Sequence, residues 1–183
     1  ALVRINRSGG AQKGHGLAVA GIAVSAAFLL FLPVMAGLLL PALAKAKSKA
    51  QSITCMNNLK QLALGAMMYS GDHNDRLPSA DNWCDALLTY TGSEAVFRCA
   101  SGAPGHRCHY GYNARLSGAE LPSVKDPDKM VLFFEVDGGW NVSGGPESML
   151  ARPRHVRVRG IAFLDGHCEL VQESRIGQLQ WGP

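Results

Sequence analysis

Charge is scarce in this chain, and over one long stretch it is missing altogether. Only 17% of the 183 residues are charged, against 47% that are hydrophobic, and the formal net charge is +4. This composition argues against a disordered chain, which combines many charges with few apolar side chains. The mild positive charge lies largely in basic residues that flank the uncharged stretch, so it indicates a membrane surface rather than nucleic acid.

The uncharged stretch covers residues 17–44, and its one polar side chain, Ser25, can bond back to its own helix. A helix needs about 20 apolar residues to cross a bilayer. A buried core helix rarely stays apolar on all sides for this length, and the apolar part of a signal peptide has about 7 to 15 residues. We therefore predict one transmembrane helix after a polar tail (residues 1–16), with kinks at Pro33 and Pro41.

Basic residues do not orient this helix. Three precede it and three follow it, which is a tie under the positive-inside rule: Arg4, Arg7 and Lys13, then Lys45, Lys47 and Lys49.

A second helical pattern follows directly, over residues 45–70. Apolar side chains recur there at spacings of three and four, which is typical of an amphipathic helix: Ala46, Ala50, Ile53, Met56, Leu59, Leu62, Ala63, Ala66 and Met67. We expect the membrane helix to continue through this segment, with one face covered by a soluble domain. Turn residues around Ser70, Gly71 and Asp72 predict its end.

Residues 71–183 predict a small soluble domain. Short apolar runs bounded by turn residues indicate strands at residues 95–97, 110–114, 130–136, 160–164 and 167–171. Residues 82–90 predict a short helix. Asp165-Gly166 separates the last two runs and favours a type I′ hairpin turn with positive φ at both positions. The predicted fold class is α+β, a long N-terminal helix packed on a small antiparallel sheet.

Several segments together resemble a known family. They are LLLPALAKAKSKAQSITCMNNLKQLALGAMMYSGDHNDRLP at residues 38–78, VFRC at 96–99, YGYNARLSG at 110–118, and His155 followed after nine residues by Asp165-Gly166. The chain resembles prepilin-like proteins related to type II secretion pseudopilins, of the kind found in planctomycete and verrucomicrobial bacteria. The resemblance implies a pilin-like fold and a structural or secretion-related role rather than catalysis.

The N-terminal segment departs from that family. Its members carry a motif of the type Gly-Phe-Thr-Leu-Ile-Glu, in which a peptidase cleaves after the Gly and the Glu guides subunit packing. Placing Pro41 on the usual helix proline puts Val19 and Val24 at these two positions. A register that begins at Gly16 puts Gly21 at the Glu position. The segment therefore resembles an ordinary membrane anchor.

His155 and Asp165 are the first candidates for chemistry. An imidazole beside a carboxylate can act as a base or as a metal ligand. A structural role explains the same residues: Asp165-Gly166 forms the hairpin turn, and His155 fixes its register by a hydrogen bond. We favour the structural role.

The five cysteines favour disulfides over metal. Soft ligands gather in one region, at Cys84, Cys99, His106, Cys108 and His109. The spacing contains no CxxC pair, and an extracytoplasmic domain favours disulfides. Five cysteines leave one unpaired or paired between chains, with several patterns open. We prefer a bridge from Cys55 to Cys99, between helix and sheet edge.

Asp72, Asn74 and Asp75 offer oxygen atoms in a tight loop, as in calcium-binding loops, although EF-hand spacing is absent. Turn capping is the interpretation that we favour.

Arg152, Arg154, Arg157 and Arg159 form a basic stretch in which residues two apart share a strand face. Such a stripe can meet phosphate, but no aromatic side chains accompany it for base stacking. We interpret it as a solvated strand face or as a contact with acidic residues of a neighbouring molecule, and expect no nucleic-acid partner.

These observations lead to one main functional hypothesis. We expect a non-enzymatic, single-pass protein of the bacterial inner membrane, with a periplasmic domain, no cofactor, and lipid and pseudopilin-like or secretion subunits as partners. One alternative is a membrane-tethered enzyme or metal site that uses His155 and Asp165. Another is a DNA-binding pilin-like module. The chain contains neither a nucleophile motif nor a Gly-rich phosphate loop to favour an enzyme.

Overall fold

The computed structural model describes residues 14–182, so Arg4, Arg7, Lys13 and most of the predicted tail at residues 1–16 lie outside the described part. The chain divides into two units, residues 1–47 and 48–183. One helix, α2 (His15–Asp72), contributes to both units and passes through Pro33 and Pro41 without interruption.

In the first unit, α2 carries large apolar side chains on its surface. Their exposed fractions run from 45% at Val19 to 83% at Leu17. The Ser25 hydroxyl donates a hydrogen bond to the Gly21 carbonyl at 2.8 Å, so its polar group is satisfied within the helix. By length and composition, this helix can cross a membrane. The prediction of one apolar helix of spanning length is confirmed to that extent.

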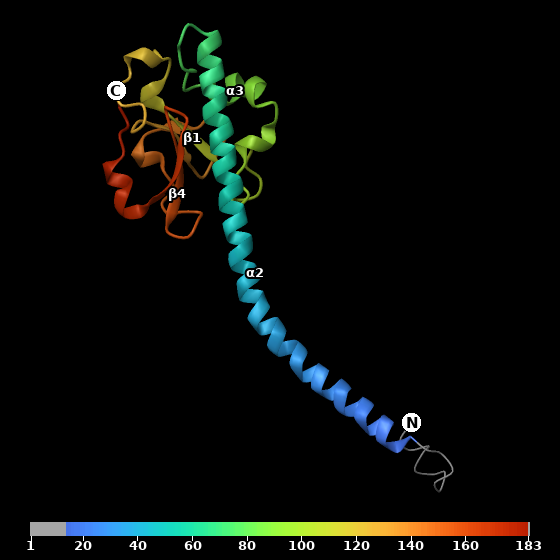
Figure 1. The fold of residues 1–183 in the computed structure, drawn as a ribbon. Coiled ribbons are helices and arrows are strands. Elements are labelled where there is room, and N and C mark those ends of the chain that lie inside the picture. The colour runs from blue at the N-terminus through green and yellow to red at the C-terminus, as the bar shows by residue number, and fades with distance from the viewer. Residues whose placement is uncertain (1–13, 183) are drawn as a thin grey trace. The chain divides into compact units, whose positions relative to one another are not determined.

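The second unit contains a five-stranded sheet with strand order β3-β1-β2-β4-β5. The strands are β1 (Tyr110–Asn113), β2 (Val131–Glu135), β3 (Ser143–Gly144), β4 (Val158–Phe163) and β5 (Cys168–Gln172). Neighbouring strands are antiparallel except β1 and β3, which are parallel. The C-terminal part of α2 packs on this sheet, and α3 (Trp83–Thr91) lies beside α2 (Figure 1). The predicted α+β class is confirmed.

Apolar side chains cover both faces of the sheet. Leu59 of α2 belongs to one buried cluster with Phe133, whereas Phe134 belongs to a second cluster with Trp181. A register shift in β2 between Val131 and Phe133 accommodates this arrangement. All five residues of β2 are buried, so this strand forms the centre of the domain.

The buried face of α2 begins later than the sequence predicted. It starts at Ser52 and Cys55 and continues through Leu59. Ala46 and Ala50 are exposed, and Ile53 is 52% exposed. Alanines fit either face of a helix, so the apolar pattern alone could not fix where the sheet begins to cover it.

Most of the predicted strands are present. The runs at 110–114, 130–136, 160–164 and 167–171 correspond to β1, β2, β4 and β5, and the helix predicted at 82–90 corresponds to α3. The strand predicted at 95–97 is wrong: η1 (Glu94–Phe97) is a 3-10 turn, begun by the Ser93 hydroxyl, which accepts a hydrogen bond from the Ala95 amide. The short parallel strand β3 was missed. The other 3-10 turns are η2 (Ala114–Leu116), η3 (Leu121–Ser123), η4 (Pro146–Ser148) and η5 (Glu173–Gln178).

Candidate functional site

A disulfide joins Cys55 of α2 to Cys99, which follows η1. The two Cα atoms are 4.9 Å apart, and both side chains are buried. The Cys55 carbonyl also accepts a hydrogen bond from the Tyr110 hydroxyl at 3.2 Å. The preferred bridge is confirmed, and it links the helix covalently to the sheet domain.

His155 lies against this disulfide. Its Nε2 is 3.7 Å from Cys99 Sγ and 3.0 Å from Glu135 Oε1. The His155 side chain is 3% exposed and the Glu135 side chain 0%. The described contacts join His155 neither to Asp165 nor to the hairpin turn. A turn over residues 155–158, with Arg157 at φ 61°, directs His155 into the interior instead.

Glu135 is the residue that the sequence reasoning missed. Within residues 14–182, neither of its carboxylate oxygens accepts a hydrogen bond. The approach to His155 is close enough for an ion pair but does not meet hydrogen-bond geometry. A buried carboxylate that accepts no hydrogen bond is costly. The sequence did contain a signal for Glu135: it is the single acidic residue inside the apolar run 130–136. Charged side chains are rarely fully buried unless they are paired, so an acidic residue in a buried strand predicts a nearby partner.

Cys55, Cys99 and His155 meet at one point. Their two sulfur atoms and one imidazole nitrogen lie within 4.8 Å of one another, and all three residues are buried. Such a closed cluster cannot admit a substrate, and Cys99 and Glu135 approach the same imidazole nitrogen. The residue types present suit cross-linking or the binding of an ion.

The hairpin turn at Asp165 is organised by His167. The Asp165 carboxylate accepts hydrogen bonds from the His167 amide at 2.9 Å and from its Nδ1 at 2.6 Å. Burial by itself raises the pKa of Asp165, but the hydrogen bonds from His167 outweigh it, so the pKa lies below its ordinary value. The turn is not the predicted type I′: among its residues, Gly166 has positive φ (85°) and Asp165 does not. Bonds between Phe163 and residues 166 and 167 indicate a three-residue loop.

Lys60 holds this turn to the helix. Its ammonium group donates a hydrogen bond to the Gly166 carbonyl at 2.6 Å. The role that the sequence suggested for His155, fixing the turn, therefore belongs to a lysine of α2.

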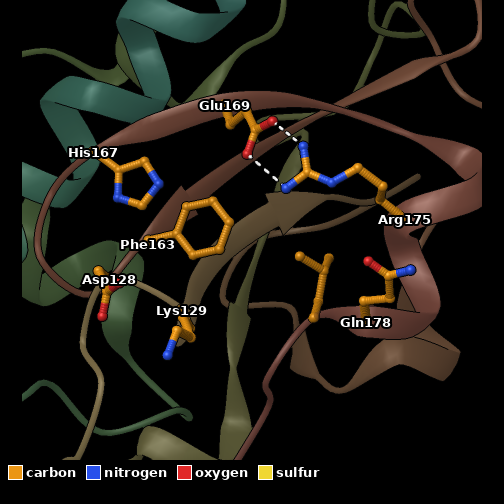
Figure 2. Close-up of a pocket in the computed structure, with 8 residues that line it drawn as sticks. Asp128, Lys129, Phe163, His167, Glu169, Arg175 and Gln178 are labelled. Carbon is orange, nitrogen blue, oxygen red and sulfur yellow. Dashed lines mark hydrogen bonds and ion pairs between the residues drawn. The ribbon is translucent and has the colours of Figure 1, made fainter.

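A surface pocket of about 290 Å³ opens beside the hairpin. The His167 ring stacks on Phe163, with centroids 4.2 Å apart. Figure 2 shows Glu169 and Arg175 paired at the rim, with Lys129 on the opposite wall. Glu169 and Arg175 neutralise each other, and Asp128 and Lys129 add one charge of each sign, so the pocket presents no strong preference for an ion of either sign.

The remaining soft ligands do not gather into one site. His109 is satisfied on both ring nitrogens: Nδ1 accepts from the Cys99 amide at 3.2 Å, and Nε2 donates to the Ala103 carbonyl at 2.9 Å. Burial lowers the pKa of His109, which favours this neutral form. The Cys108 thiol donates a hydrogen bond to the Tyr110 carbonyl at 3.2 Å, and the Cys84 sulfur accepts one from the Asn141 amide at 3.3 Å. His106 is exposed.

The loop proposed for calcium is an exposed turn. Asn74 and Asp75 have φ of 56° and 58°, the left-handed region that these residue types tolerate. The Asp72 carboxylate accepts a hydrogen bond from the Tyr90 hydroxyl at 3.0 Å. This hydrogen bond connects the end of α2 with α3.

The basic stretch does not form one solvated face. Arg154 donates hydrogen bonds to the carbonyls of His109 and Val136, and its side chain is 7% exposed. Arg159 pairs with Glu173 and is equally buried. Strand β4 begins only at Val158, so the alternation expected of one extended strand does not apply. Arg152 and Arg157 are exposed.

Comparisons with known proteins add no relative to this geometry: no family model, no curated protein and no solved structure matches the chain.

Proposed function

We propose that this chain is a membrane-anchored, pseudopilin-like structural protein that acts through contacts with other protein subunits. The observation that carries this function is helix α2 itself. Its first part exposes apolar side chains without a charge, and the same helix continues into the core of a folded domain.

The exposed apolar surface needs a cover. Apolar surface in water costs about 25 cal/mol per Å² relative to burial, so a helix that is apolar on all sides favours lipid or another protein. Residues 17–44 extend over roughly 42 Å at 1.5 Å per residue, more than the roughly 30 Å of hydrocarbon in a bilayer. Lipid therefore accounts for this segment, and one helix makes a single-pass anchor.

Two prolines favour neighbours inside the membrane. Pro33 and Pro41 donate no backbone hydrogen bond, which leaves the carbonyls of Leu29 and Gly37 without their helical partners. In hydrocarbon, such carbonyls need partners from other helices, side chains or water. Gly37 has open space around it, so another helix can approach closely there.

The soluble unit offers a second contact surface. Ile53, Leu64 and Met68 on α2 are 52%, 48% and 58% exposed. We call these three residues the outer face of α2. These side chains share one side of the helix, and a partner that covered them would gain the free energy of burying their apolar surface.

The disulfide supports a location outside the cytoplasm. Disulfides persist in oxidising compartments such as the bacterial periplasm. The Cys55–Cys99 bridge lies in the second unit. We propose the inner membrane for the anchor and the periplasm for the domain. The partner class, pseudopilin-like or secretion subunits, comes from the family resemblance.

The two alternatives from the sequence have less support. His155 and Asp165 have separate partners, so they do not form the proposed catalytic pair. Two of the four arginines of the basic stretch bind within the protein, which weakens a DNA-binding surface.

A photo-cross-linking experiment tests the proposed contacts. A benzophenone amino acid replaces Leu64 on the outer face of α2, and in a matched control it replaces the exposed Lys125. After irradiation of intact cells, we expect the Leu64 position to form adducts with a second copy or with a pilin-like membrane subunit, and the Lys125 position to form none. Absence of such adducts at Leu64 would contradict the proposed function.

A further inference from the structure

The buried cluster around the disulfide contains more polar groups than a covalent bridge requires. The disulfide joins α2 to the segment after η1 without help. His155, in the turn before β4, nevertheless lies against it, and Glu135, at the end of β2, lies 3.0 Å from His155. Glu135 is fully buried and accepts no hydrogen bond within residues 14–182. A costly carboxylate in such a position indicates a partner that is bound in another state of the protein.

We propose that reduction of the Cys55–Cys99 disulfide creates a zinc site with Cys55, Cys99, His155 and Glu135 as its four ligands. Two thiolates, an imidazole and a carboxylate are all ligands that zinc accepts, and four ligands complete a closed tetrahedral site. The charge of the ion compensates the buried carboxylate, which otherwise accepts no hydrogen bond.

The distance from Cys99 to His155 suits a tetrahedral ion, whereas Glu135 lies closer to His155 than two ligands of such an ion would. With Zn–S of about 2.3 Å and Zn–N and Zn–O of about 2.0–2.2 Å, neighbouring ligand atoms lie roughly 3.4–3.8 Å apart. Cys99 Sγ is 3.7 Å from His155 Nε2, and Glu135 Oε1 is 3.0 Å from the same nitrogen. The His155 ring therefore needs no large movement. The two sulfur atoms separate after their bond is broken, and the Glu135 carboxylate, which lies outside the group formed by Cys55, Cys99 and His155, moves into the fourth position.

The chemistry balances with an ordinary reductant. A dithiol transfers two electrons and two protons to the disulfide: the S–S bond breaks, two protein thiols form, and the dithiol becomes a disulfide. Zinc then displaces the two thiol protons, because thiolates are the metal ligands. His155 binds the ion through its Nε2 lone pair, and Glu135 binds it through a carboxylate oxygen.

Zinc would preserve the connection that the disulfide makes. The four ligands come from α2, the segment after η1, β2 and the turn before β4. An ion at their centre holds the helix on the sheet when the covalent bridge is absent. The domain would then keep its architecture in both oxidising and reducing conditions.

Cobalt(II) is the probe that tests this site. The full chain in detergent is reduced with a phosphine, which becomes the phosphine oxide, and is titrated with Co²⁺. We expect one ion per chain, with the sulfur-to-cobalt charge-transfer bands and intense visible bands of a tetrahedral thiolate site, and displacement of Co²⁺ by Zn²⁺. Protein that keeps its disulfide should show none of these bands.

Variants assign the ligands. His155→Ala should lose the tetrahedral bands, and Glu135→Gln should lower the affinity about tenfold or more. The matched control is the triple variant Cys84→Ala, Cys108→Ala, Cys168→Ala, which should keep the full spectrum. In the wild type, bound zinc should also protect Cys55 and Cys99 from alkylation, a readout that requires no variant.

Several results would overturn the zinc site. The first is that the reduced, folded wild type shows no charge-transfer bands. The second and third are that the bands persist in His155→Ala or vanish in the triple variant. The fourth is that Cys55 and Cys99 are alkylated at the same rate with and without zinc. A reduced chain whose circular dichroism shows unfolding in the presence of zinc contradicts the site equally.

Discussion

At the scale of single residues, the packing around His109 depends on a glycine. A Cβ atom at Gly102 would overlap the His109 ring. That ring is fixed by its two hydrogen bonds, to the Cys99 amide and to the Ala103 carbonyl, so it cannot move aside freely. Gly102 therefore keeps open the space in which a neutral histidine stabilises the segment around the disulfide.

Gly102→Ala should destabilise the domain by about 1–3 kcal/mol, the usual effect of overpacking. Urea unfolding of the wild type and the variant measures the difference. The matched control is Gly71→Ala, which lies in α2 with open space around it and should change stability by no more than about 1 kcal/mol, in the stabilising direction. Equal stability of Gly102→Ala and the wild type would contradict this packing.

The thiols that remain outside the bridge should differ in reactivity. Among the described residues Cys84, Cys108 and Cys168 are free, and the first two are fully buried. Burial raises the pKa of Cys168 to about 11. The thiolate is the reactive form, so Cys168 should alkylate first, at a rate that keeps rising from pH 7 to pH 10 without a plateau.

Mass spectrometry after timed alkylation of the native protein measures these rates. Cys84 and Cys108 should react only when the protein is unfolded. A plateau for Cys168 near pH 8.5, the behaviour of an ordinary cysteine, would show that its thiol is not buried as described.

At the scale of elements, the hairpin between β4 and β5 connects local sequence with helix packing. Asp165 binds His167 within the turn, and Lys60 of α2 binds the Gly166 carbonyl. The turn is therefore stabilised from both sides, by its own carboxylate and by the helix.

Acid should weaken this turn. The folded pKa of Asp165 lies below its ordinary value of about 3.8. A carboxyl group with a lowered folded pKa stabilises the folded state above its unfolded pKa, and that contribution is lost as pH falls through the folded pKa. Between pH 5 and pH 3, the wild type should therefore lose more stability than Asp165→Asn, which cannot titrate. Parallel stability profiles for the two proteins would contradict this role of Asp165.

Local signals in the sequence were sufficient for most elements and failed for a few. The short apolar runs at β4 and β5 and the Asp165-Gly166 pair predicted the hairpin, but the type I′ turn required a positive φ that Asp165 does not adopt. η1 was mistaken for a strand because a short apolar run has no clear period. β3 has two residues and pairs with β1 through distant contacts, so no local pattern marked it.

Partners across the fold were the hardest to predict. His155 was expected to meet Asp165, because both belong to one sequence signature, whereas it meets Glu135 and Cys99 from other elements. The Cys55–Cys99 bridge was predicted because a helix and a sheet edge were already expected to pack together. The contacts of His155 with Glu135 and Cys99 depend on how distant elements pack in the fold, and the spacing of residues along the sequence does not indicate that packing.

At the scale of the whole molecule, the account depends on where the first part of α2 resides. An uncharged apolar segment and a folded domain share one helix, and the domain has its own two-sided core. The proposed anchoring, the subunit contacts and the periplasmic location all require that this segment lie in lipid.

Extraction of membranes at alkaline pH tests that requirement most directly. The full chain should remain in the membrane pellet, whereas a variant with Leu29→Lys and Leu30→Lys should move to the supernatant, because each charge at the centre of a membrane helix costs about 2.5–3.5 kcal/mol. The matched control, Ile53→Lys on the exposed side of α2 in the domain, should stay in the pellet. Release of the unaltered chain into the supernatant would contradict a membrane anchor.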